Sequence, residues 1–351
     1  MSKKYPIILS FDTSCDDTSV AITQGMRVLS NIVASQEELH RKYGGVMPLV
    51  AKLAHHEQIN PAYQEALKRA HVKPQQIDVI AVTYGPGLAI ALEVGLAFAK
   101  ELAQEFGKPL IAVNHMAGHL YSVLAQNAKG QIKPQNISFP VLALLASGGH
   151  TELLLLTSFT HVKKIGQTID DAAGEALDKF ARLIDLGYPG AAALEQIAKQ
   201  GNGKMYQFPL PMTKNQNLDF SFSGLKTAGR HQIEELQNDQ SKTLSRQEIS
   251  NLAASFQAAV FRAIIYKLKK AIKLYQPKTL WLGGGVSNNT NLRSQLRQIA
   301  KESNLDFQYP YSKKLMSDNA AMIGTAAYLL YEKQDIVEDL EKLHRQPRLS
   351  L

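Results

Sequence analysis

Two histidines one helical turn apart are the residues of this sequence whose spacing most directly suggests chemistry. They occur in the segment NHMAGH at residues 114–119. If this segment is helical, His115 and His119 lie on one face, as two ligands of a single divalent ion would. The pattern alone is weak, because two surface histidines without a ligand have the same spacing. A zinc peptidase would carry a glutamate directly after the first histidine as its general base, and Met116 occupies that position.

Asp318 is our candidate for a third ligand of this ion. It lies in the polar segment SDN at residues 317–319, just before a helix that we predict to begin at Ala320. Two imidazoles and one carboxylate would leave a divalent ion with positions open to a substrate. We expect such a site to lie between two lobes of the chain, with the metal bridging them.

A second group of residues is suited to binding an anion. Residues 139–157 read FPVLALLASGGHTELLLLT, two apolar runs separated by the turn SGGHT. Both runs have the length of strands, so the stretch predicts a buried β-hairpin. Adjacent glycines permit positive φ and close approach, so that successive amides could bind a phosphate. An ordinary glycine turn is the alternative, and the pattern alone does not choose between them.

The elements around these groups indicate an internal duplication. Ile7–Ile22 predicts another hairpin, whose turn is rich in Asp, Ser and Thr. Ile77–Leu88 and Thr279–Asn289 each predict a strand that ends in a glycine loop before a helix. Each half thus offers a hairpin, helices and a strand with a glycine loop. We interpret the chain as two copies of an α/β lobe that share one ligand across a cleft.

This interpretation divides the chain into an N-terminal lobe, residues 1–136, and a C-terminal lobe, residues 137–351. An insertion from Asp170 to about Gln237 interrupts the second lobe. Within it, acidic and basic residues spaced three and four apart predict one face of a helix capped by Asp170 or Asp171. The tail HRQPR at residues 344–348 is basic, and its composition is compatible with disorder.

The composition is that of a globular protein. Of 351 residues, 45% are hydrophobic and 20% are charged, and no apolar run approaches the roughly 20 residues of a membrane span. Cys15 is the single cysteine, which excludes a disulfide framework, and we interpret it as a buried thiol. The net charge of +8 suggests an anionic partner, although solvated helix faces are the simpler explanation of the basic clusters. These clusters comprise Lys267, Lys269, Lys270, Lys273, Arg293, Arg297, Lys301, Lys313 and Lys314.

Nine motifs, in order from about Ile7 to Gly324, resemble those of one family. They are FDTSCDDT, YGPGL, NHMAGH, SGGHT, IDDAAGEALDK, GYPG, LDFSFSGLKT, GGGVSNN and SDNAAMIG. The resemblance is to the bacterial tRNA N6-adenosine threonylcarbamoyltransferases, the TsaD family, formerly described as O-sialoglycoprotein endopeptidases. It implies a duplicated actin/Hsp70/sugar-kinase-like (ribonuclease H-like) fold. It also implies transfer of a threonylcarbamoyl group from threonylcarbamoyl-AMP to N6 of adenine 37, forming t6A in tRNAs that read codons beginning with A.

The resemblance also implies roles for individual residues. One divalent ion per subunit, Fe2+ or Zn2+, would be bound by His115, His119 and Asp318. Asp16 corresponds to an acidic residue of the first hairpin, and we take it as the candidate proton acceptor. The adenylate would contact Leu145, Ala146, Ser147, Gly148, Gly149, Asp178, Gly190, Ala191, Glu195 and Asn289.

Three of the matching positions depart from the usual family pattern. Asp17 replaces the usual Glu after Asp16, and Glu195 stands where many members have Asp. Ala191 replaces the second glycine of the YPGG loop, where a Cβ would crowd the nucleotide.

The family resemblance further implies partners and a compartment. These are tRNA, threonylcarbamoyl-AMP supplied by another enzyme, a catalytically silent paralogue of the TsaB type and a small ATPase of the TsaE type. We expect a cytoplasmic protein without a membrane segment, and reread the basic clusters as a tRNA-facing surface. The alternatives are a metallopeptidase, a sugar or acyl-phosphate kinase and a nucleotide-dependent scaffold of the same fold.

Overall fold

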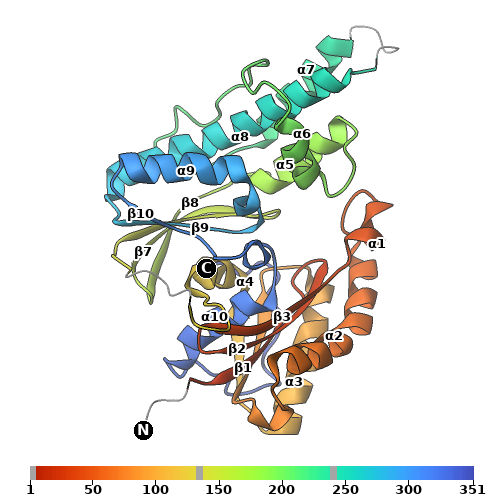
Figure 1. Cartoon of the computed structure of the whole chain (residues 1–351), viewed down its shortest axis with the longest axis vertical. Coiled ribbons are helices and arrows are strands. Elements are labelled where there is room, and N and C mark those ends of the chain that lie inside the picture. The colour runs from red at the N-terminus through yellow and green to blue at the C-terminus, as the bar shows by residue number, and fades with distance from the viewer. Residues whose placement is uncertain (1–4, 132–136, 238–242) are drawn as a thin grey trace. The chain divides into compact units, whose positions relative to one another are not determined.

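The protein forms two compact units in a computed structural model that describes residues 5–131, 137–237 and 243–351 (Figure 1). The first unit combines residues 1–136 with residues 309–351, and the second consists of residues 137–308. The boundary after residue 136 agrees with the predicted lobes. The C-terminal stretch does not, because residues 309–351 pack with the first unit and not with the second.

A five-stranded mixed sheet forms the centre of the first unit. Its strands lie in the order β3-β2-β1-β4-β5, with antiparallel pairing among β1, β2 and β3 and parallel pairing of β1 with β4 and of β4 with β5. The strands are β1 (Ile7–Asp12), β2 (Asp17–Gln24), β3 (Arg27–Ser35), β4 (Val79–Gly85) and β5 (Leu110–Asn114).

Alternation along the strands directs side chains to two faces of this sheet that are covered by different helices. Leu9 and Phe11 of β1 belong to a hydrophobic core with residues of α2 (Pro48–Ala70) and α3 (Ala89–Phe106). Ser10 points to the other face, where its hydroxyl donates to Ala320 O over 2.7 Å at the start of α10 (Ala320–Tyr331). The remaining helices of this unit are α1 (Glu37–Arg41), η1 (Pro74–Gln76), α4 (His115–Tyr121), η2 (Ser122–Leu124) and η4 (Lys313–Leu315).

The second unit repeats the same sheet. Read from β8, its order β8-β7-β6-β9-β10 matches the order β3-β2-β1-β4-β5 of the first sheet strand for strand. The pairings also match, since β6, β7 and β8 pair antiparallel while β6 with β9 and β9 with β10 pair parallel. The predicted duplication is therefore confirmed at the level of topology. The strands are β6 (Val141–Ala146), β7 (Thr151–Ser158), β8 (His161–Gln167), β9 (Thr279–Gly283) and β10 (Asp306–Gln308). The helices are α5 (Ala173–Leu183), α6 (Gly190–Ala198), α7 (Ser223–Gln237), α8 (Arg246–Tyr275), η3 (Gly285–Asn288) and α9 (Thr290–Glu302).

Helix α8 fastens a long irregular segment to the second unit. Arg262 donates to Phe208 O over 3.0 Å, and Tyr266 donates to Thr213 O over 3.0 Å. Lys267, which is only 1% exposed, donates to Asn217 O over 2.8 Å. This lysine is therefore used inside the unit, and its place in a tRNA-facing surface was wrong. Among the described residues α8 alone has the length and apolar character of a membrane span, and 72% of its apolar window is buried, as in a core helix.

Asp170 caps a different helix from the one predicted. Its carboxylate accepts hydrogen bonds from the amides of Phe222 (2.8 Å) and Ser223 (3.3 Å) and from the Ser221 and Ser223 hydroxyls, at the start of α7. Burial acts to raise the pKa of Asp170, but these hydrogen bonds lower it overall. Helix α5, which follows Asp170 directly, has Ala172 at its N-cap instead. The sequence could not show that the FSFSG segment, about 50 residues away, supplies the donors.

Candidate metal centre and nucleotide-binding loops

Helix α4 holds its two histidines in the interior of the first unit. It begins directly after β5, where the Asn114 side chain accepts hydrogen bonds from Met116 N (2.8 Å) and Ala117 N (3.3 Å). His115 is 6% exposed and His119 is fully buried. A Cβ on Gly118 would lie 2.9 Å from Ile323 Cδ1, so the glycine lets α4 pack closely against α10.

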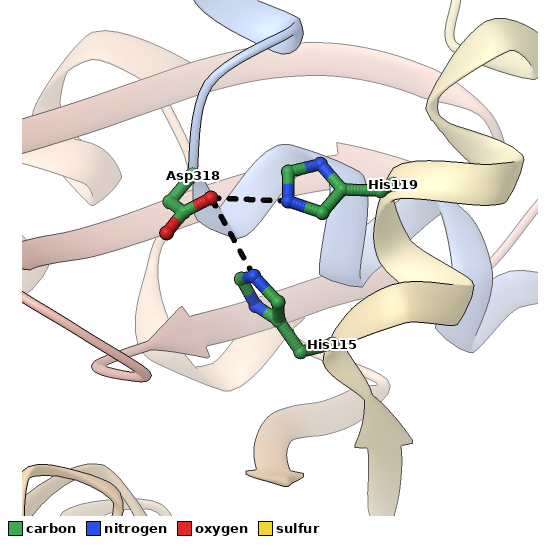
Figure 2. Close-up of side chains that lie close together, drawn as sticks. All are labelled: His115, His119 and Asp318. Carbon is green, nitrogen blue, oxygen red and sulfur yellow. Dashed lines mark ion pairs between the residues drawn. The ribbon is translucent and has the colours of Figure 1, made fainter. Parts of the chain in front are cut away.

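Asp318 completes the predicted constellation. Its Oδ1 lies 3.0 Å from His119 Nε2 and 3.5 Å from His115 Nε2, as the dashed lines in Figure 2 show. One potential ligand atom from each of the three residues lies within 4.8 Å of the others. All three residues belong to the first unit. The expectation that the ion bridges two lobes was therefore wrong, because Asp318 belongs to the stretch that packs beside α4.

The donor set suits a divalent transition metal. His119 Nε2, which faces Asp318 Oδ1, is buried and makes no hydrogen bond of regular geometry. Two imidazole nitrogens and one carboxylate oxygen are ligands that Zn2+ and Fe2+ accept, with positions left for a substrate. Burial alone lowers the pKa of His115, but the carboxylates of Asp318 and Asp12 raise it to about 10. Burial likewise opposes ionisation of Asp318, yet the two histidines hold its pKa well below the usual value. The negative charge in this cluster attracts a cation.

Asp12 is a contributor that the sequence analysis missed. It is 1% exposed at the carboxyl end of β1, and its Oδ1 lies 3.5 Å from His115 Nδ1. Since His115 Nε2 faces Asp318, a carboxylate on the opposite nitrogen orients the ring for metal binding. The available signal was the position of Asp12 at the end of the first strand, near the edge where β5 also ends.

The turn between β1 and β2 carries Asp16 and Asp17. Burial raises the pKa of Asp17 to about 7, and the charges of Asp16, Asp318 and Asp12 add to the rise, against a hydrogen bond from Ser35. The turn therefore lies within electrostatic range of the metal candidates. Asp16 is half-buried in this turn, and its carbonyl accepts from Gln36 N over 3.2 Å. The role of Asp16 as proton acceptor stays a prediction.

Cys15 in the same turn is a free, half-buried cysteine. Burial, followed by the charge of Asp16, raises the pKa of its thiol well above the usual value. A thiolate is the reactive form, so the interpretation of Cys15 as an inert thiol agrees with its surroundings. Its carbonyl faces His55 Nε2 at 3.0 Å, and this contact helps to fix the turn.

The SGGHT turn lies at the carboxyl end of β6, beside the glycine loop that follows β9. Ser147 N donates to His150 O over 2.8 Å, and His150 N donates to Ser147 Oγ over 3.1 Å, which closes the turn. A Cβ on Gly148 or Gly149 would meet no atom within 4 Å, so both face open space. Neither has the positive φ that we expected. The glycines therefore leave room for a ligand rather than relieve backbone strain.

Three of the other adenylate candidates maintain the loops around this turn. Asp178 Oδ1 accepts from Ala191 N over 2.6 Å at the start of α6. Glu195 Oε1 accepts from both the amide (2.9 Å) and the hydroxyl (2.8 Å) of Thr290. Asn289 is 5% exposed, caps α9 through Oδ1 and donates through Nδ2 to Gln257 Oε1 over 2.7 Å. These side chains fasten α5, α6 and α9 to one another.

The close approach of α5 and α6 explains Gly190. A Cβ there would lie 2.5 Å from the Cβ of Ala181 and 3.0 Å from Asp178 O. The amide of the next residue, Ala191, donates to Asp178. Leu145 and Ala146 are buried in β6 and contribute backbone groups at the strand end.

Comparisons with known proteins identify the family. A family model described as tRNA N6-adenosine threonylcarbamoyltransferase matches residues 27–325. The chain belongs to this family. A relative of that name from Thermosipho africanus is 41% identical over 327 residues, covering 93% of this chain and 95% of the relative. The relative from Moorella thermoacetica is 43% identical over 331 residues, covering 93% of each. The one from Ligilactobacillus salivarius is 43% identical and covers 100% of this chain and 98% of its own.

Solved structures at lower identity share the fold. T. kodakarensis HypF has a TM-score of 0.59 at 15% identity, covering 96% of this chain and 49% of HypF. The activator of the 2-hydroxyisocaproyl-CoA dehydratase from Clostridium difficile has a TM-score of 0.52 at 13% identity, covering 94% and 96%. The two-sheet topology and these neighbours confirm the predicted actin/Hsp70/sugar-kinase-like fold. Membership of the threonylcarbamoyltransferase family disfavours the peptidase, kinase and scaffold alternatives.

Proposed function

We propose that this chain is the acyltransferase that moves a threonylcarbamoyl group from threonylcarbamoyl-AMP to N6 of adenine 37, forming t6A in tRNAs that read codons beginning with A. The observation that carries the proposal is the family match over residues 27–325. That stretch contains the His115–His119 pair, Asp318 and the SGGHT turn. Named relatives of nearly the same length support the same activity.

One divalent ion, Fe2+ or Zn2+, would be held by His115, His119 and Asp318. When bound, it would act as a Lewis acid that attracts the carboxylate or hydroxyl oxygen of the threonyl group. Asp12 keeps the His115 ring oriented through its Nδ1. Burial of both imidazoles excludes water from the ligands, which strengthens their attraction for a cation.

The SGGHT turn would bind the phosphate of the adenylate. Its open glycines leave the backbone amides accessible, and amides donate strong hydrogen bonds to an anion. Asp178, Glu195 and Asn289 maintain the loops that shape this site, and Gly190 and Ala191 border it. Leu145 and Ala146 would contribute contacts from the end of β6.

In the reaction, the N6 amine forms a bond to the carbamoyl carbon. The bond from that carbon to the phosphate oxygen then breaks, AMP leaves with the electron pair, and N6 loses a proton to Asp16. Because an exocyclic amine is a poor nucleophile, we expect fixed donors at the phosphate to contribute more than the base does. An adenine in a single-stranded anticodon loop is easily splayed out, which suits an RNA substrate.

We further propose that the protein works in the cytoplasm with a TsaB-type paralogue and a TsaE-type ATPase. Support comes from large apolar side chains exposed around α1 and the first half of α2, which a partner subunit would cover. Leu49 and Leu53 are 65% and 58% exposed, and the neighbouring exposed residues are Val33, Leu39, Tyr43 and Met47. Multi-turnover modification by this chain alone, given adenylate and tRNA, would contradict the dependence on partners.

The central experiment is mass spectrometry of tRNA nucleosides from cells depleted of the protein. We expect t6A to disappear and to return with the wild-type gene. It should not return with a variant in which His115 and His119 are both replaced by Ala. If t6A persists in the depleted cells, the proposed function is refuted.

A further inference from the structure

We propose that the C-terminal segment Gln346–Ser350 is a positioning element for the metal-binding helix α4, and that Asn114 transmits its effect. The inference rests on the proposed metal site and assigns a role to residues outside it. The segment is ordered and hydrogen bonded to the first unit, in contrast to the disorder that its composition allows.

Asn114 contacts α4 with one end of its amide and the C-terminal segment with the other. Its Oδ1 accepts from Met116 N and Ala117 N in the first turn of α4. Its Nδ2 donates to Ser350 O over 3.2 Å. The amide plane is thus held from both ends, directly beside His115. Any rotation of this side chain would loosen the helix turn that orients the first metal ligand.

The segment is also bonded to the loop that follows β4. Gln346 N donates to Tyr84 O over 2.7 Å, and Gly87 N donates to Pro347 O over 3.2 Å. Arg345, just before the segment, forms an ion pair with Glu93 on α3. Because Gly85 and Asn114 are register partners on β4 and β5, the segment spans the carboxyl ends of both strands.

Gly85 fits the C-terminal segment closely. A Cβ at this position would lie 1.9 Å from Gln346 O, 2.8 Å from Gln346 C and 3.2 Å from Leu349 Cβ. All three of the nearest atoms belong to the segment. A side chain at position 85 would therefore collide first with the C-terminal segment and displace it. Gly85 also has a φ of +159°, which strains a side chain in the loop itself, so the shortened chain is needed to separate the segment's role from that of the loop.

The consequence for the site concerns metal affinity. Residues that orient a metal ligand through hydrogen bonds commonly contribute 10–100-fold to affinity. The C-terminal segment contacts Asn114, and Asn114 in turn positions His115, so its effect on the metal ligand is indirect. We therefore expect it to contribute about tenfold to metal affinity, the lower end of this range. A purely structural role would change unfolding without changing the affinity of the folded protein for the ion.

The test is a titration with Co2+, whose visible absorption reports binding independently of catalysis. The proteins compared are the wild type, Asn114→Asp, Gly85→Ala, a chain ending at Leu343, and the shortened chain carrying each substitution. Aspartate caps a helix as well as asparagine does, but it cannot donate to Ser350 O. Gly45→Ala is the matched control, since its Cβ would meet no atom within 4 Å and its φ is not left-handed.

We expect the Co2+ dissociation constant to rise about tenfold in Asn114→Asp, in Gly85→Ala and in the shortened chain. Once the segment is removed, Asn114→Asp should not weaken binding further, Gly85→Ala should weaken it less than in the full chain because only its backbone strain remains, and Gly45→Ala should bind like the wild type. If the shortened chain fails to fold, the two substitutions in the full chain carry the test, with circular dichroism as the check on folding.

Two negative outcomes are distinguishable. If the wild type binds Co2+ and the folded variants bind it equally well, the role of the segment is overturned while the metal site stands. If the substitutions weaken binding equally with and without the segment, the role of the segment is also overturned. If the wild type does not bind Co2+ at all, the proposed metal site fails, and the inference with it.

Discussion

Replacement of Gly148 by valine should strongly weaken binding of the adenylate phosphate without harming the fold. A Cβ at position 148 would meet no atom within 4 Å, and the residue does not have a left-handed φ. The thermal midpoint of the free protein should therefore change little. The branched side chain would instead occupy the open space through which the phosphate reaches the turn amides.

The size of the effect follows from the bonds that are lost. A hydrogen bond to a charged group contributes about 1.5–3 kcal/mol, so blocking two amides costs about 3 kcal/mol or more. At about 1.4 kcal/mol per factor of ten, the dissociation constant should rise roughly 100-fold or more. Ser147→Ala removes one hydroxyl, whose oxygen already accepts from His150 N, and should cost no more than about tenfold.

The assay is calorimetric titration with AMP, which carries the same phosphate and is stable in solution. Gly174→Ala is the contrasting variant, because its Cβ would lie 2.5 Å from Ser147 O and 3.0 Å from Gly148 Cα. That variant should lower the thermal midpoint as well as AMP affinity. Equal losses of affinity for Gly148→Val and Ser147→Ala, with both proteins folded, would refute binding through the turn amides.

Further predictions concern the metal ligands, a helix cap and the proton acceptor. His119→Ala should lose its metal in elemental analysis, whereas His56→Ala, on the exposed face of α2, should retain it; equal metal content would rule out the ligand set. Asp170→Ala should lower the free energy of unfolding by about 1 kcal/mol at neutral pH, as loss of a cap does. Because the folded-state pKa of Asp170 is lowered, its contribution is present above the unfolded pKa and is lost as pH falls through the folded pKa. In denaturation experiments, the free energies of unfolding of the wild type and the variant should therefore converge as the pH is lowered. A difference that stays constant with pH would contradict the role of the Asp170 carboxylate as the cap. Asp16→Asn, once shown to bind the adenylate normally, should slow single-turnover transfer to tRNA by about 10²-fold or more. A wild-type rate would refute Asp16 as the proton acceptor and would mean that substrate positioning alone accounts for catalysis.

Local pattern was sufficient to predict much of the fold. The apolar runs of β1, β4, β6 and β9 are buried on both faces, so continuous hydrophobic segments that end in polar or glycine-rich turns located them correctly. The helical spacing of His115 and His119 predicted the pair, because residues four apart necessarily share a helix face. The duplication could be inferred from the repeated order of hairpin and glycine loop.

Contacts between distant parts of the chain could not be predicted in the same way. Nothing local to Asp318 shows that α10 packs on the first sheet, since Ser10 and Ser19, which bond its first residues, lie some 300 positions earlier. Asp12 escaped notice for the same reason, because its partner is on α4. Glu195 was predicted from the family motif to contact the adenylate, and its carboxylate accepts hydrogen bonds from Thr290. Polar side chains that satisfy distant backbone groups carry no sequence period by which to recognise them.

The return of the chain to its first unit has a consequence for biosynthesis. Residues 137–308 form a unit from one continuous stretch, whereas the first unit lacks Asp318 and α10 until the whole of the second unit has been made. At a translation rate of about 5–20 residues per second, the roughly 200 residues between His119 and Asp318 take about 10–40 s to synthesise. During that interval the sheet face that includes Ser10 and Ala21 is without its covering helix, and the histidine pair is without its carboxylate. Asp318 and helix α10 thus leave the ribosome together, so we predict that an ion held by His115, His119 and Asp318 is bound only after the unit is complete.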